Sequence, residues 1–566
     1  MSKEKNTRQL YTAQGEKLLS GEIKNTWDIY PRPMLKRNSF YSLNGKWDII
    51  TDKGREEILV PFPPESILSG IGRKIADNPR YSYEKKFTLP DGFVKDRVIL
   101  HFGAVDQICT LKLNGNFVGE HIGGYDAFSF DITKYLKDEN FIQLSVEDNL
   151  DSHILPYGKQ KNKRGGMWYT PISGIWQSVW LESVPENYIS GLDIEVTLNS
   201  ARIRFLGIES GEVIVSAPNG KIKADIVDGV AEIKIEDPIN WTPENPYLYE
   251  FVAVSGEDRI ESYFALRTLE VKEVDGYPRL CLNGKPYFFH ALLDQGYYPD
   301  GIFTPASHEC YEQDVLFAKK YGFNTLRKHI KVEPECFYHY CDRYGIIVFQ
   351  DMVNNAHYSF LFDTALPTVG MQKFPDKMLH RNQKSRQAYI ESMKKTLNQL
   401  KNHPSICMWT VFNEGWGQFE ADKMYHEIKA LDASRFVDTT SGWFRAKNTD
   451  VESLHIYFKP VKLKKAKKPL FISEFGGYSY KENGHIFNED NTYGYGKYAD
   501  RGEFEDAFVS LYEQQIIPNI QKGLCGTVYT QISDVEDETN GLITYDRKFV
   551  KVDKERMNKL SENLKI

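Results

Sequence analysis

The chain has 566 residues and a formal net charge of −7, from 71 Lys and Arg against 78 Asp and Glu. Its length predicts about three or four domains. With 41% hydrophobic and 26% charged residues, the composition is typical of globular proteins and excludes a disordered chain, a coiled coil and a collagen-like fibre. Because basic residues are not in excess, a nucleic-acid partner is not expected.

The amino-terminal segment and the cysteines bear on the cellular compartment. The first residues are basic and polar and lack the apolar run of a secretory signal, and no apolar stretch approaches the roughly 18 residues of a membrane span. The seven cysteines are odd in number, and Cys109, Cys281 and Cys407 lie in apolar runs, which predicts buried free thiols. These features predict a cytoplasmic protein without a membrane partner. A longer precursor with a secretory signal is the alternative.

The first half of the chain has the period-two pattern of β-strands. Cys109, Leu111 and Leu113 alternate with polar residues and are followed by Asn114-Gly115, the residue pair of a two-residue hairpin turn. Short strands continue beyond residue 185 at a spacing that fits a seven-stranded sandwich. We therefore expect one β-sandwich domain in residues 1–185 and a second, immunoglobulin-like one in residues 186–275.

The second half alternates apolar runs with helical patterns. Tyr311, Val315 and Ala318 form one helical stripe, and two more stripes follow near residues 389–400 and 424–431. The apolar runs give eight candidate strands: 287–292, 324–329, 345–352, 405–414, 436–442, 451–458, 469–477 and 526–534. This alternation predicts a (β/α)₈ barrel in residues 276–566. The lysine-rich run at 459–469 is expected to be a solvated loop, with a site for an anionic substrate as the alternative.

Two carboxylates end candidate strands of the barrel. Glu414 ends the fourth strand and Glu474 the seventh, and catalytic groups of such barrels lie at the carboxyl ends of strands. A carboxylate pair there suits glycoside hydrolysis, in which one group protonates the leaving oxygen and the other attacks the anomeric carbon or activates water. Ion-paired glutamates without a catalytic role are the alternative.

Four segments resemble one enzyme family. Asn413-Glu414 in WTVFNEGWGQ is similar to the Asn-Glu signature of glycoside hydrolase family 2, which contains β-galactosidases, β-glucuronidases and β-mannosidases. Residues 169–182, 241–250 and 534–547 resemble other motifs of that family in the right order, so the resemblance covers nearly the whole chain. It implies a jelly-roll, sugar-binding-like domain first, then an immunoglobulin-like domain and the catalytic barrel, with no organic cofactor.

The resemblance also implies roles for residues of this chain. Glu414 matches the acid/base and Glu474 the nucleophile of a retaining mechanism, which places the carboxyls about 5–5.5 Å apart. Asn413 matches the residue that binds the sugar 2-hydroxyl. Arg327 matches an arginine that orients the nucleophile and keeps it ionised. His455 is expected beside the nucleophile.

Other residues are candidates for substrate binding. An ordinary core role is the alternative for Tyr457 and the two tryptophans below, as it is for Asn413, Arg327 and His455. Tyr457 is expected to donate a hydrogen bond to the nucleophile. Two tryptophans that follow strands could stack on the sugar, and polar residues after the first and third strands could bind its hydroxyls; these are Trp416, Trp443, Asp294, Gln295, Asp351 and Asn354. No metal ligands are carried over, because the pattern around them differs from that of the large β-galactosidases.

The identity of the sugar is the least determined feature. Glu538-Thr539-Asn540 stands where the glucuronidases of the family carry Asn-x-Lys, and a carboxylate facing the site there would repel a uronate. A β-galactosidase is therefore our first expectation, with β-uronidase, β-mannosidase and arabinose-releasing activities, or transglycosylation, as alternatives. A non-catalytic carbohydrate-binding protein is the alternative of another class. A homo-oligomer is possible, and no residue pattern selects one.

Overall fold

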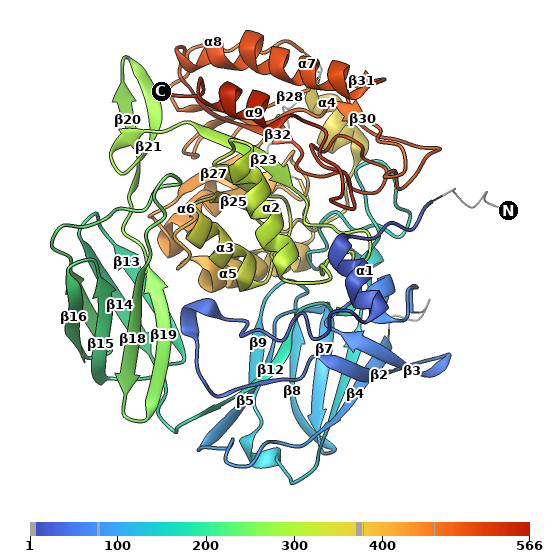
Figure 1. The fold of residues 1–566 in the computed structure, drawn as a ribbon, viewed down its shortest axis with the longest axis vertical. Helices are drawn as coiled ribbons and strands as arrows, with labels where there is room; N and C mark the ends of the chain where they lie inside the picture. Colours follow the sequence, from blue (N-terminus) through green and yellow to red (C-terminus); the bar gives the residue numbers. More distant parts are fainter. Residues whose placement is uncertain (1–6, 76–79, 369–375, 377–378, 458) are drawn as a thin grey trace.

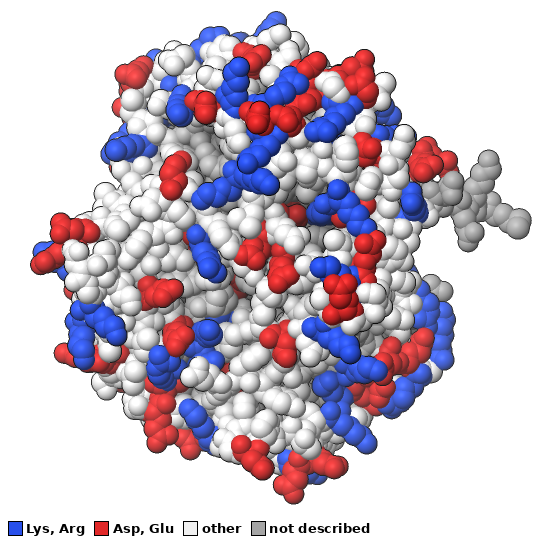
Figure 2. All heavy atoms as spheres, viewed as in Figure 1, with Lys and Arg blue, Asp and Glu red and all other residues white. Residues whose placement is uncertain are grey.

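The computed structural model describes residues 7–75, 80–368, 376, 379–457 and 459–566. Figure 1 shows three regions: an amino-terminal β-sandwich at the bottom in blue and cyan, a smaller sandwich at the left in green, and the barrel at the centre and top. No helix among the residues described is both long enough and apolar enough to cross a membrane. Acidic and basic side chains are interspersed over the face shown in Figure 2.

The amino-terminal sandwich has two main sheets. One has the order β3–β2–β4–β10–β7–β8 and consists of β2 (Gly45–Thr51), β3 (Gly54–Val60), β4 (Arg80–Phe87), β7 (Ile108–Leu113), β8 (Asn116–Ile122) and β10 (Asn140–Glu147). The other has the order β1–β12–β5–β9 and consists of β1 (Phe40–Ser42), β5 (Arg97–Phe102), β9 (Phe128–Asp131) and β12 (Val179–Val184). A short pair, β6 (Val105–Asp106) and β11 (Gly174–Ile175), accompanies them.

The predicted hairpin of this domain is confirmed. Asn114 and Gly115 join β7 to β8 with φ angles of 52° and 81°, the left-handed pair that a tight hairpin turn requires. In β7, Cys109, Leu111 and Leu113 are buried, as the period of two predicts. All seven cysteines of the chain are buried and free.

The second sandwich is a seven-stranded sheet that folds back on itself. Its order is β13–β14–β17–β16–β15–β18–β19, with β13 (Gly191–Val196), β14 (Ser200–Leu206), β15 (Ser210–Ala217), β16 (Gly220–Val227), β17 (Val230–Lys234), β18 (Tyr249–Ser255) and β19 (Asp258–Phe264). β16 and β17 pair only at Val227 and Val230, so the strands on either side of this hairpin form two layers. Ile203 of one layer and Phe251 of the other belong to one core.

The barrel has one strand in each of the eight predicted segments, so the predicted (β/α)₈ fold is confirmed. The strands are β23 (Phe289–Asp294), β24 (Thr325–Lys328), β25 (Ile347–Asp351), β26 (Ile406–Asn413), β27 (Phe436–Ser441), β28 (Glu452–Ile456), β29 (Leu470–Gly476) and β32 (Leu524–Thr530). They pair in parallel around the ring. Between β27 and β28 the ring is closed by a side-chain hydrogen bond, 2.7 Å from Ser453 Oγ to Asp438 Oδ2.

Helices surround the barrel. They are α2 (Glu309–Lys320), α3 (Glu335–Tyr344), α4 (Leu366–Thr368), α5 (Gln383–Leu400), α6 (Ala421–Leu431), α7 (Arg501–Leu511), α8 (Ile517–Ile520) and α9 (Lys554–Ser561). The three predicted stripes lie in α2, α5 and α6. The lysine-rich run connects β28 to β29, and Lys465 Nζ lies 5.1 Å from the ring centre of Tyr277, beyond the amino-terminal end of the barrel. This places that part of the run away from the carboxyl ends of the strands.

Two parts of the chain cross the expected domain boundaries. The expected boundary at 275/276 falls in the turn between β20 (Leu269–Val274) and β21 (Tyr277–Leu282), two strands that pair along their whole length beside β22 (Lys285–Pro286). The segment around α1 (Ala13–Ser20) packs on the barrel loop after β23. There, Trp27 Nε1 donates to the Pro305 carbonyl at 2.9 Å and the Thr12 hydroxyl donates to Asp300 at 2.7 Å.

The barrel strands separate two cores. Ala291 and Leu293 of β23 join a core cluster with Phe349 and Met408, which fills the barrel. Leu292, between them, joins the cluster that includes the helix residues of the outer layer. Because side chains alternate along a strand, the residue number decides which side of the barrel wall a side chain occupies.

Candidate functional site

The two predicted catalytic carboxylates lie side by side at the carboxyl ends of the barrel strands. Glu474 belongs to β29 and Glu414 directly follows β26. One carboxylate oxygen of each and Nδ1 of His455 all lie within 4.8 Å of one another. Glu414 has a positive φ of 54° and is followed by Gly415 at 76°, so the chain turns sharply here. A left-handed non-glycine residue is strained, and such strain is typical of functional sites.

Glu474 is held as a carboxylate by its neighbours. Arg327 Nη1 donates to Oε1 at 3.1 Å and the Tyr457 hydroxyl donates to Oε2 at 2.5 Å. Burial alone would raise the pKa of Glu474, but the nearby charges of His455 and Arg327 and the Tyr457 hydrogen bond outweigh it and lower the pKa to about 2. Glu474 is therefore ionised at neutral pH.

Arg327 connects several residues of the site. Its guanidinium binds both oxygens of Asp351, at 2.9 and 3.0 Å, and donates to Asn413 Oδ1 at 2.9 Å. A further bond, 2.9 Å to the Ser473 carbonyl, fixes it to the strand that carries Glu474. A planar guanidinium with partners in several directions cannot rotate away. The predicted role of Arg327 in orienting Glu474 thus fits its geometry.

Glu414 is positioned by the imidazole of His455. His455 Nδ1 and Glu414 Oε1 are hydrogen-bonded at 2.8 Å, and His455 Nε2 is 3.1 Å from Ser441 Oγ. Trp443 is half-buried and meets the His455 ring edge-on at 5.9 Å, so it lies next to the imidazole that binds Glu414, and its stacking on a sugar stays a prediction. Ser441, which sequence analysis missed, ends β27 and has no motif that identifies it.

Trp416 does not present an open face to a sugar. Only 3% of its surface is exposed, and its ring centre lies 5.4 Å from that of Tyr157 and 5.1 Å from that of Trp168. Trp416 Nε1 donates to the Ala356 carbonyl at 3.1 Å. The expectation of a stacking platform is therefore wrong for this residue, because other aromatic rings already cover it.

Asp294 faces away from the site. It shares the outward parity of Leu292 in β23, and its Oδ2 binds Lys328 Nζ at 2.6 Å. Lys328 Nζ in turn lies 4.3 Å from the ring centre of Phe337 in α3, on the outer side of the barrel wall. The prediction that Asp294 binds the sugar is wrong, because the alternation of the strand turns its carboxylate toward the helices.

The other polar candidates differ in whether they keep an oxygen atom free to bind the sugar. Gln295 is 4% exposed, and its Oε1 has no hydrogen-bond partner among the residues that the structure describes. Asp351 is instead occupied by Arg327 and by His329 Nδ1, which is 2.7 Å away. Asp351 thus supports the arginine and does not offer a free oxygen to the sugar. Asn354 donates to the Trp416 carbonyl at 2.6 Å, while its Oδ1 has no partner among the described residues.

A loop of the amino-terminal sandwich reaches the barrel mouth, which sequence analysis missed. We call residues 153–170 the sandwich loop. The Tyr157 hydroxyl donates to the Ala356 carbonyl at 2.8 Å, and Trp168 packs edge-on against Tyr358 and Trp416. These contacts join residues about 200 or more positions apart in the sequence, so no local pattern could have revealed them.

The sandwich loop also contacts Glu538, the residue that departs from the glucuronidase pattern. Glu538 accepts hydrogen bonds from the Tyr169 hydroxyl at 2.8 Å, Gln531 Nε2 at 3.0 Å and Asn540 Nδ2 at 3.2 Å. Burial raises its pKa to about 7, against the lowering effect of the charge of Lys159. Glu538 is thus a buried carboxyl whose charge changes near neutral pH.

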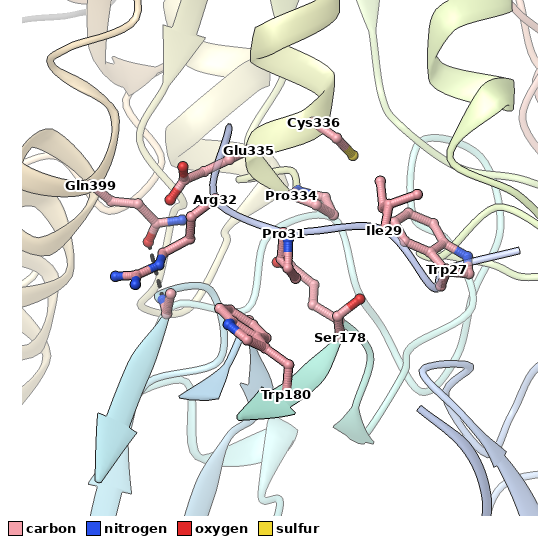
Figure 3. A pocket seen from close by; sticks show the side chains of 13 residues that line it. Trp27, Ile29, Pro31, Arg32, Ser178, Trp180, Pro334, Glu335, Cys336 and Gln399 are labelled. Carbon is pink, nitrogen blue, oxygen red and sulfur yellow. Dashed lines mark hydrogen bonds between the residues drawn. The ribbon is translucent and has the colours of Figure 1, made fainter. Parts of the chain in front are cut away.

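The spacing of Glu414, His455 and Glu474 would also admit a metal ion. The nearby Arg327 guanidinium and the mutual hydrogen bond of His455 and Glu414 make the site better suited to keeping a carboxylate and an acid in place. A separate cavity of about 30 Å³ lies where the amino-terminal segment meets the sandwich and the barrel, between Trp27, Trp180 and Glu335 (Figure 3). It has room for about one water molecule and is not lined by the site residues.

Comparisons with known proteins agree with the sequence motifs. A family model described as "Glycosyl hydrolases family 2, TIM barrel domain" matches residues 279–562, and one described as "Glycosyl hydrolases family 2, sugar binding domain" matches residues 67–185. A β-galactosidase of Thermoanaerobacter pseudethanolicus is 27% identical over 385 residues, 62% of this chain and 47% of the relative. A β-glucuronidase of Felis catus is 25% identical over 402 residues, 62% of this chain and 58% of the relative. The chain spans about half the length of these curated relatives.

Solved structures share the fold at lower sequence identity. A β-D-glucuronidase from Dictyoglomus thermophilum superposes with a TM-score of 0.72 at 20% identity, covering 94% of this chain and 98% of that one. A β-galacturonidase from Eisenbergiella tayi bound to galacturonate has a TM-score of 0.66 at 18% identity, covering 95% and 99%. At these identities the likeness concerns the fold alone.

Proposed function

This chain belongs to glycoside hydrolase family 2, and we propose that it is a retaining exo-β-glycosidase that removes a terminal β-linked sugar by double displacement. The observation that carries this proposal is the carboxylate pair, with oxygens of Glu414 and Glu474 within 4.8 Å. Retaining enzymes keep their two carboxyls about 5–5.5 Å apart, whereas inverting enzymes need about 6.5–9.5 Å to admit a water molecule between carboxylate and sugar.

In the first step Glu474 is the nucleophile. Its carboxylate attacks the anomeric carbon while Glu414, as the acid, protonates the glycosidic oxygen. The bond from the anomeric carbon to that oxygen breaks, and an ester bond to Glu474 forms. The low pKa of Glu474 keeps its electron pair available for this attack at neutral pH.

In the second step water replaces the aglycone. Glu414, now ionised, removes a proton from a water molecule, which attacks the anomeric carbon and releases Glu474 as a carboxylate. The sugar leaves with its original β configuration, because the carbon has been inverted twice. His455 holds the Glu414 side chain in place for both proton transfers.

Three further residues support the reacting groups. Tyr457 donates to Glu474 and limits its rotation. Arg327 donates a hydrogen bond to Oδ1 of Asn413 and so fixes the orientation of this amide. The Nδ2 of Asn413 is then left to donate to the sugar 2-hydroxyl. Such a hydrogen bond strengthens as positive charge develops on the sugar ring in the transition state.

The terminal sugar that the enzyme removes, the glycone, has several candidates. From the sequence a β-galactoside is the first candidate and a β-uronide the second; Lys159, discussed below, moves the β-uronide ahead. β-Mannosides and arabinosides are further alternatives. A carbohydrate is the expected partner, and a cytoplasmic location and a homo-oligomer are proposals that the site does not address.

Activity on a panel of 4-nitrophenyl β-glycosides tests this function. The panel contains galactoside, glucuronide, galacturonide, mannoside, glucoside and fucoside, with an α-L-arabinoside, and is assayed with wild type, Glu474→Gln and Glu452→Gln. Glu452 begins β28 at the opposite end of the barrel and is a matched control. We expect Glu474→Gln to lower kcat by roughly 10³-fold or more and Glu452→Gln to leave it unchanged.

Two further readouts address the mechanism. Proton NMR of the first product should show the β-anomer, and a 2-deoxy-2-fluoro glycoside should label Glu474 covalently. Formation of the α-anomer first would exclude retention. If Glu474→Gln retains full turnover, Glu474 is not the nucleophile. If wild type binds sugars but cleaves none of them, the carbohydrate-binding alternative is favoured.

A further inference from the structure

Lys159 lies in the sandwich loop with most of its side chain buried. It is 8% exposed, and its ammonium makes no hydrogen bond or ion pair among the residues that the structure describes. The ring centre of Trp168, 6.0 Å from Nζ, is a weak cation–π neighbour. The Nζ atom itself remains accessible to solvent, so the ammonium is open to a ligand, and the mechanism proposed above gives Lys159 no role. A ligand that supplies the missing negative charge would explain why the lysine is there.

The sandwich loop places Lys159 over the carboxyl ends of the barrel strands. The backbone amides of Tyr157 and Gly158 donate to the Asn354 carbonyl at 3.1 and 3.2 Å, just after β25. A Cβ atom on Gly158 would lie 2.9 Å from the Ile330 carbonyl, just after β24. The Tyr169 amide donates to the Lys159 carbonyl at 3.0 Å and closes the loop. Lys159 is therefore fixed at the same end of the barrel as the two catalytic carboxylates.

The charge of Lys159 acts on two groups of the site. Its charge lowers the pKa of Glu538 against the larger, opposite effect of burial. Burial lowers the pKa of His329, and the charge of Lys159 lowers it further. His329 is hydrogen-bonded to Asp351, which in turn holds Arg327 next to Glu474. Lys159 thus lies near enough to influence both sides of the site.

The neighbouring carboxylates do not neutralise Lys159. Glu538 already accepts three hydrogen bonds, and no oxygen of it comes within 4.0 Å of the ammonium. Glu474 and Asp351 are paired with Arg327 instead. Among the described residues, Lys159 thus has no carboxylate partner and is left for a ligand.

We propose that Lys159 binds an anionic group on the terminal sugar of the substrate, a carboxylate at C6 or a sulfate ester. This inference rests on the proposed glycosidase function and names its substrate class. It makes a residue of the amino-terminal sandwich the determinant of sugar specificity, in a chain that carries Glu538 and Asn540 where the related glucuronidases carry Asn and Lys.

The test compares acidic and neutral substrates in matched variants. We would measure kcat/KM on 4-nitrophenyl β-D-galacturonide, β-D-glucuronide, β-D-galactoside and β-D-galactoside 6-sulfate for wild type, Lys159→Met and Lys161→Met. Lys161 is an exposed lysine of the same loop whose Nζ lies 5.0 Å from the centre of the same Trp168 ring. It therefore controls for loss of charge in the loop.

We expect wild type to prefer an acidic substrate and Lys159→Met to lower kcat/KM on it by roughly 30-fold or more, since a lost charge-assisted hydrogen bond has about this effect. Activity of Lys159→Met on the galactoside should change less than about threefold, and so should Lys161→Met on every substrate. Loss on the uronides identifies a carboxylate as the ligand; loss on the sulfated galactoside alone identifies a sulfate ester. Equal losses on neutral and acidic substrates would overturn the proposal.

Two measurements separate this inference from the proposed function. If wild type cleaves only neutral glycosides, the glycosidase function stands and the role of Lys159 is refuted. If wild type cleaves none, calorimetric titration of wild type and Lys159→Met with D-galacturonate and D-glucuronate still decides, because binding lost in the variant supports anion recognition and its absence in wild type contradicts it. Lys159→Met should unfold at a temperature close to that of wild type, since it removes no ion pair or side-chain hydrogen bond among the described residues.

Discussion

Adjacent residues of β24 carry buried cations to opposite sides of the barrel wall. Arg327 points inward and binds Asp351 and Glu474, while Lys328 points outward and binds Asp294 and Glu333. Both cations have side chains that are 1% exposed, and both have two carboxylate partners. By burial and charge alone, the inner and outer clusters cannot be distinguished.

The two clusters differ in what they leave unsatisfied. In the outer one, Glu333 also binds the Tyr311 hydroxyl and Lys331, so its charges are matched within the fold. In the inner one, Oδ1 of Asp438, whose charge acts on Arg327, has no hydrogen-bond partner among the described residues, and Glu474 lies next to a second carboxylate. Buried charge is therefore not in itself a sign of function. Polar atoms without a hydrogen-bond partner next to a buried charge indicate a functional site better than the buried charge does.

The largest expected difference between the clusters is in catalysis. Arg327→Met should lower kcat by about 10³-fold, because it removes a hydrogen bond and a charge that keep Glu474 ionised. Without Arg327 the pKa of Glu474 rises, so the acidic limb of the pH–activity profile should move to higher pH. Steady-state kinetics from about pH 4 to 8 measures both effects. An unchanged acidic limb would show that Arg327 does not control the ionisation of Glu474.

The matched outward substitution, Lys328→Met, should affect stability instead. It leaves the buried Asp294 without its ion-pair partner and Glu333 with Lys331 alone, which should cost about 3–5 kcal/mol of the free energy of unfolding. Activity per folded molecule should remain within about twofold of wild type. Chemical denaturation together with active-site titration separates the two quantities. A large fall in kcat of the folded variant would mean that the outer cluster contributes to the site.

A second pair of variants sharpens the comparison with a smaller change. Asp351→Asn and Asp294→Asn each replace one buried carboxylate by an amide of similar shape. We expect Asp351→Asn to lower kcat by roughly 10–100-fold through a displaced Arg327, and Asp294→Asn to lower stability by about 2 kcal/mol with little effect on kcat. If the two variants exchange these effects, the assignment of inner and outer sides is wrong.

The smallest effect concerns pH and the acidic substrate. Glu538, with a pKa raised to about 7 by burial, is neutral below that pH and repels an anionic sugar above it. The ratio of kcat/KM for a galacturonide to that for a galactoside should therefore fall several-fold as pH rises from about 6 to 8. Using the ratio cancels groups that act on both substrates. Glu538→Gln should make it independent of pH, and a ratio that still falls in this variant would point to another group.

Much of the fold could be predicted from the sequence, because it is encoded locally. The eight barrel strands follow from apolar runs, and three helices follow from stripes such as Tyr311, Val315 and Ala318. Glu414 and Glu474 could be identified because each ends a strand and one belongs to a recognisable motif. Their approach to each other then follows from the closed barrel, whose strand ends meet at one rim.

The errors at the site have physical causes. The sequence predicts the correct end of β23 for Asp294 but not its side of the barrel wall, because a one-residue difference reverses the direction of a strand side chain. Trp416 was expected to be open, but rings from Tyr157 and Trp168 cover it. The sandwich loop could not be predicted, since its contacts connect distant parts of the chain, as in the 2.8 Å hydrogen bond from Thr170 to Glu536.

The sandwich loop has a consequence for how such an enzyme can change. If Lys159 selects the sugar, substrate preference is encoded in a domain that holds neither catalytic carboxylate. Mutations in that domain could then change which sugar the enzyme prefers, while the residues that cleave the glycosidic bond stay the same. Conversely, the isolated barrel domain would lack the sandwich loop. It would therefore lack part of the wall around its substrate.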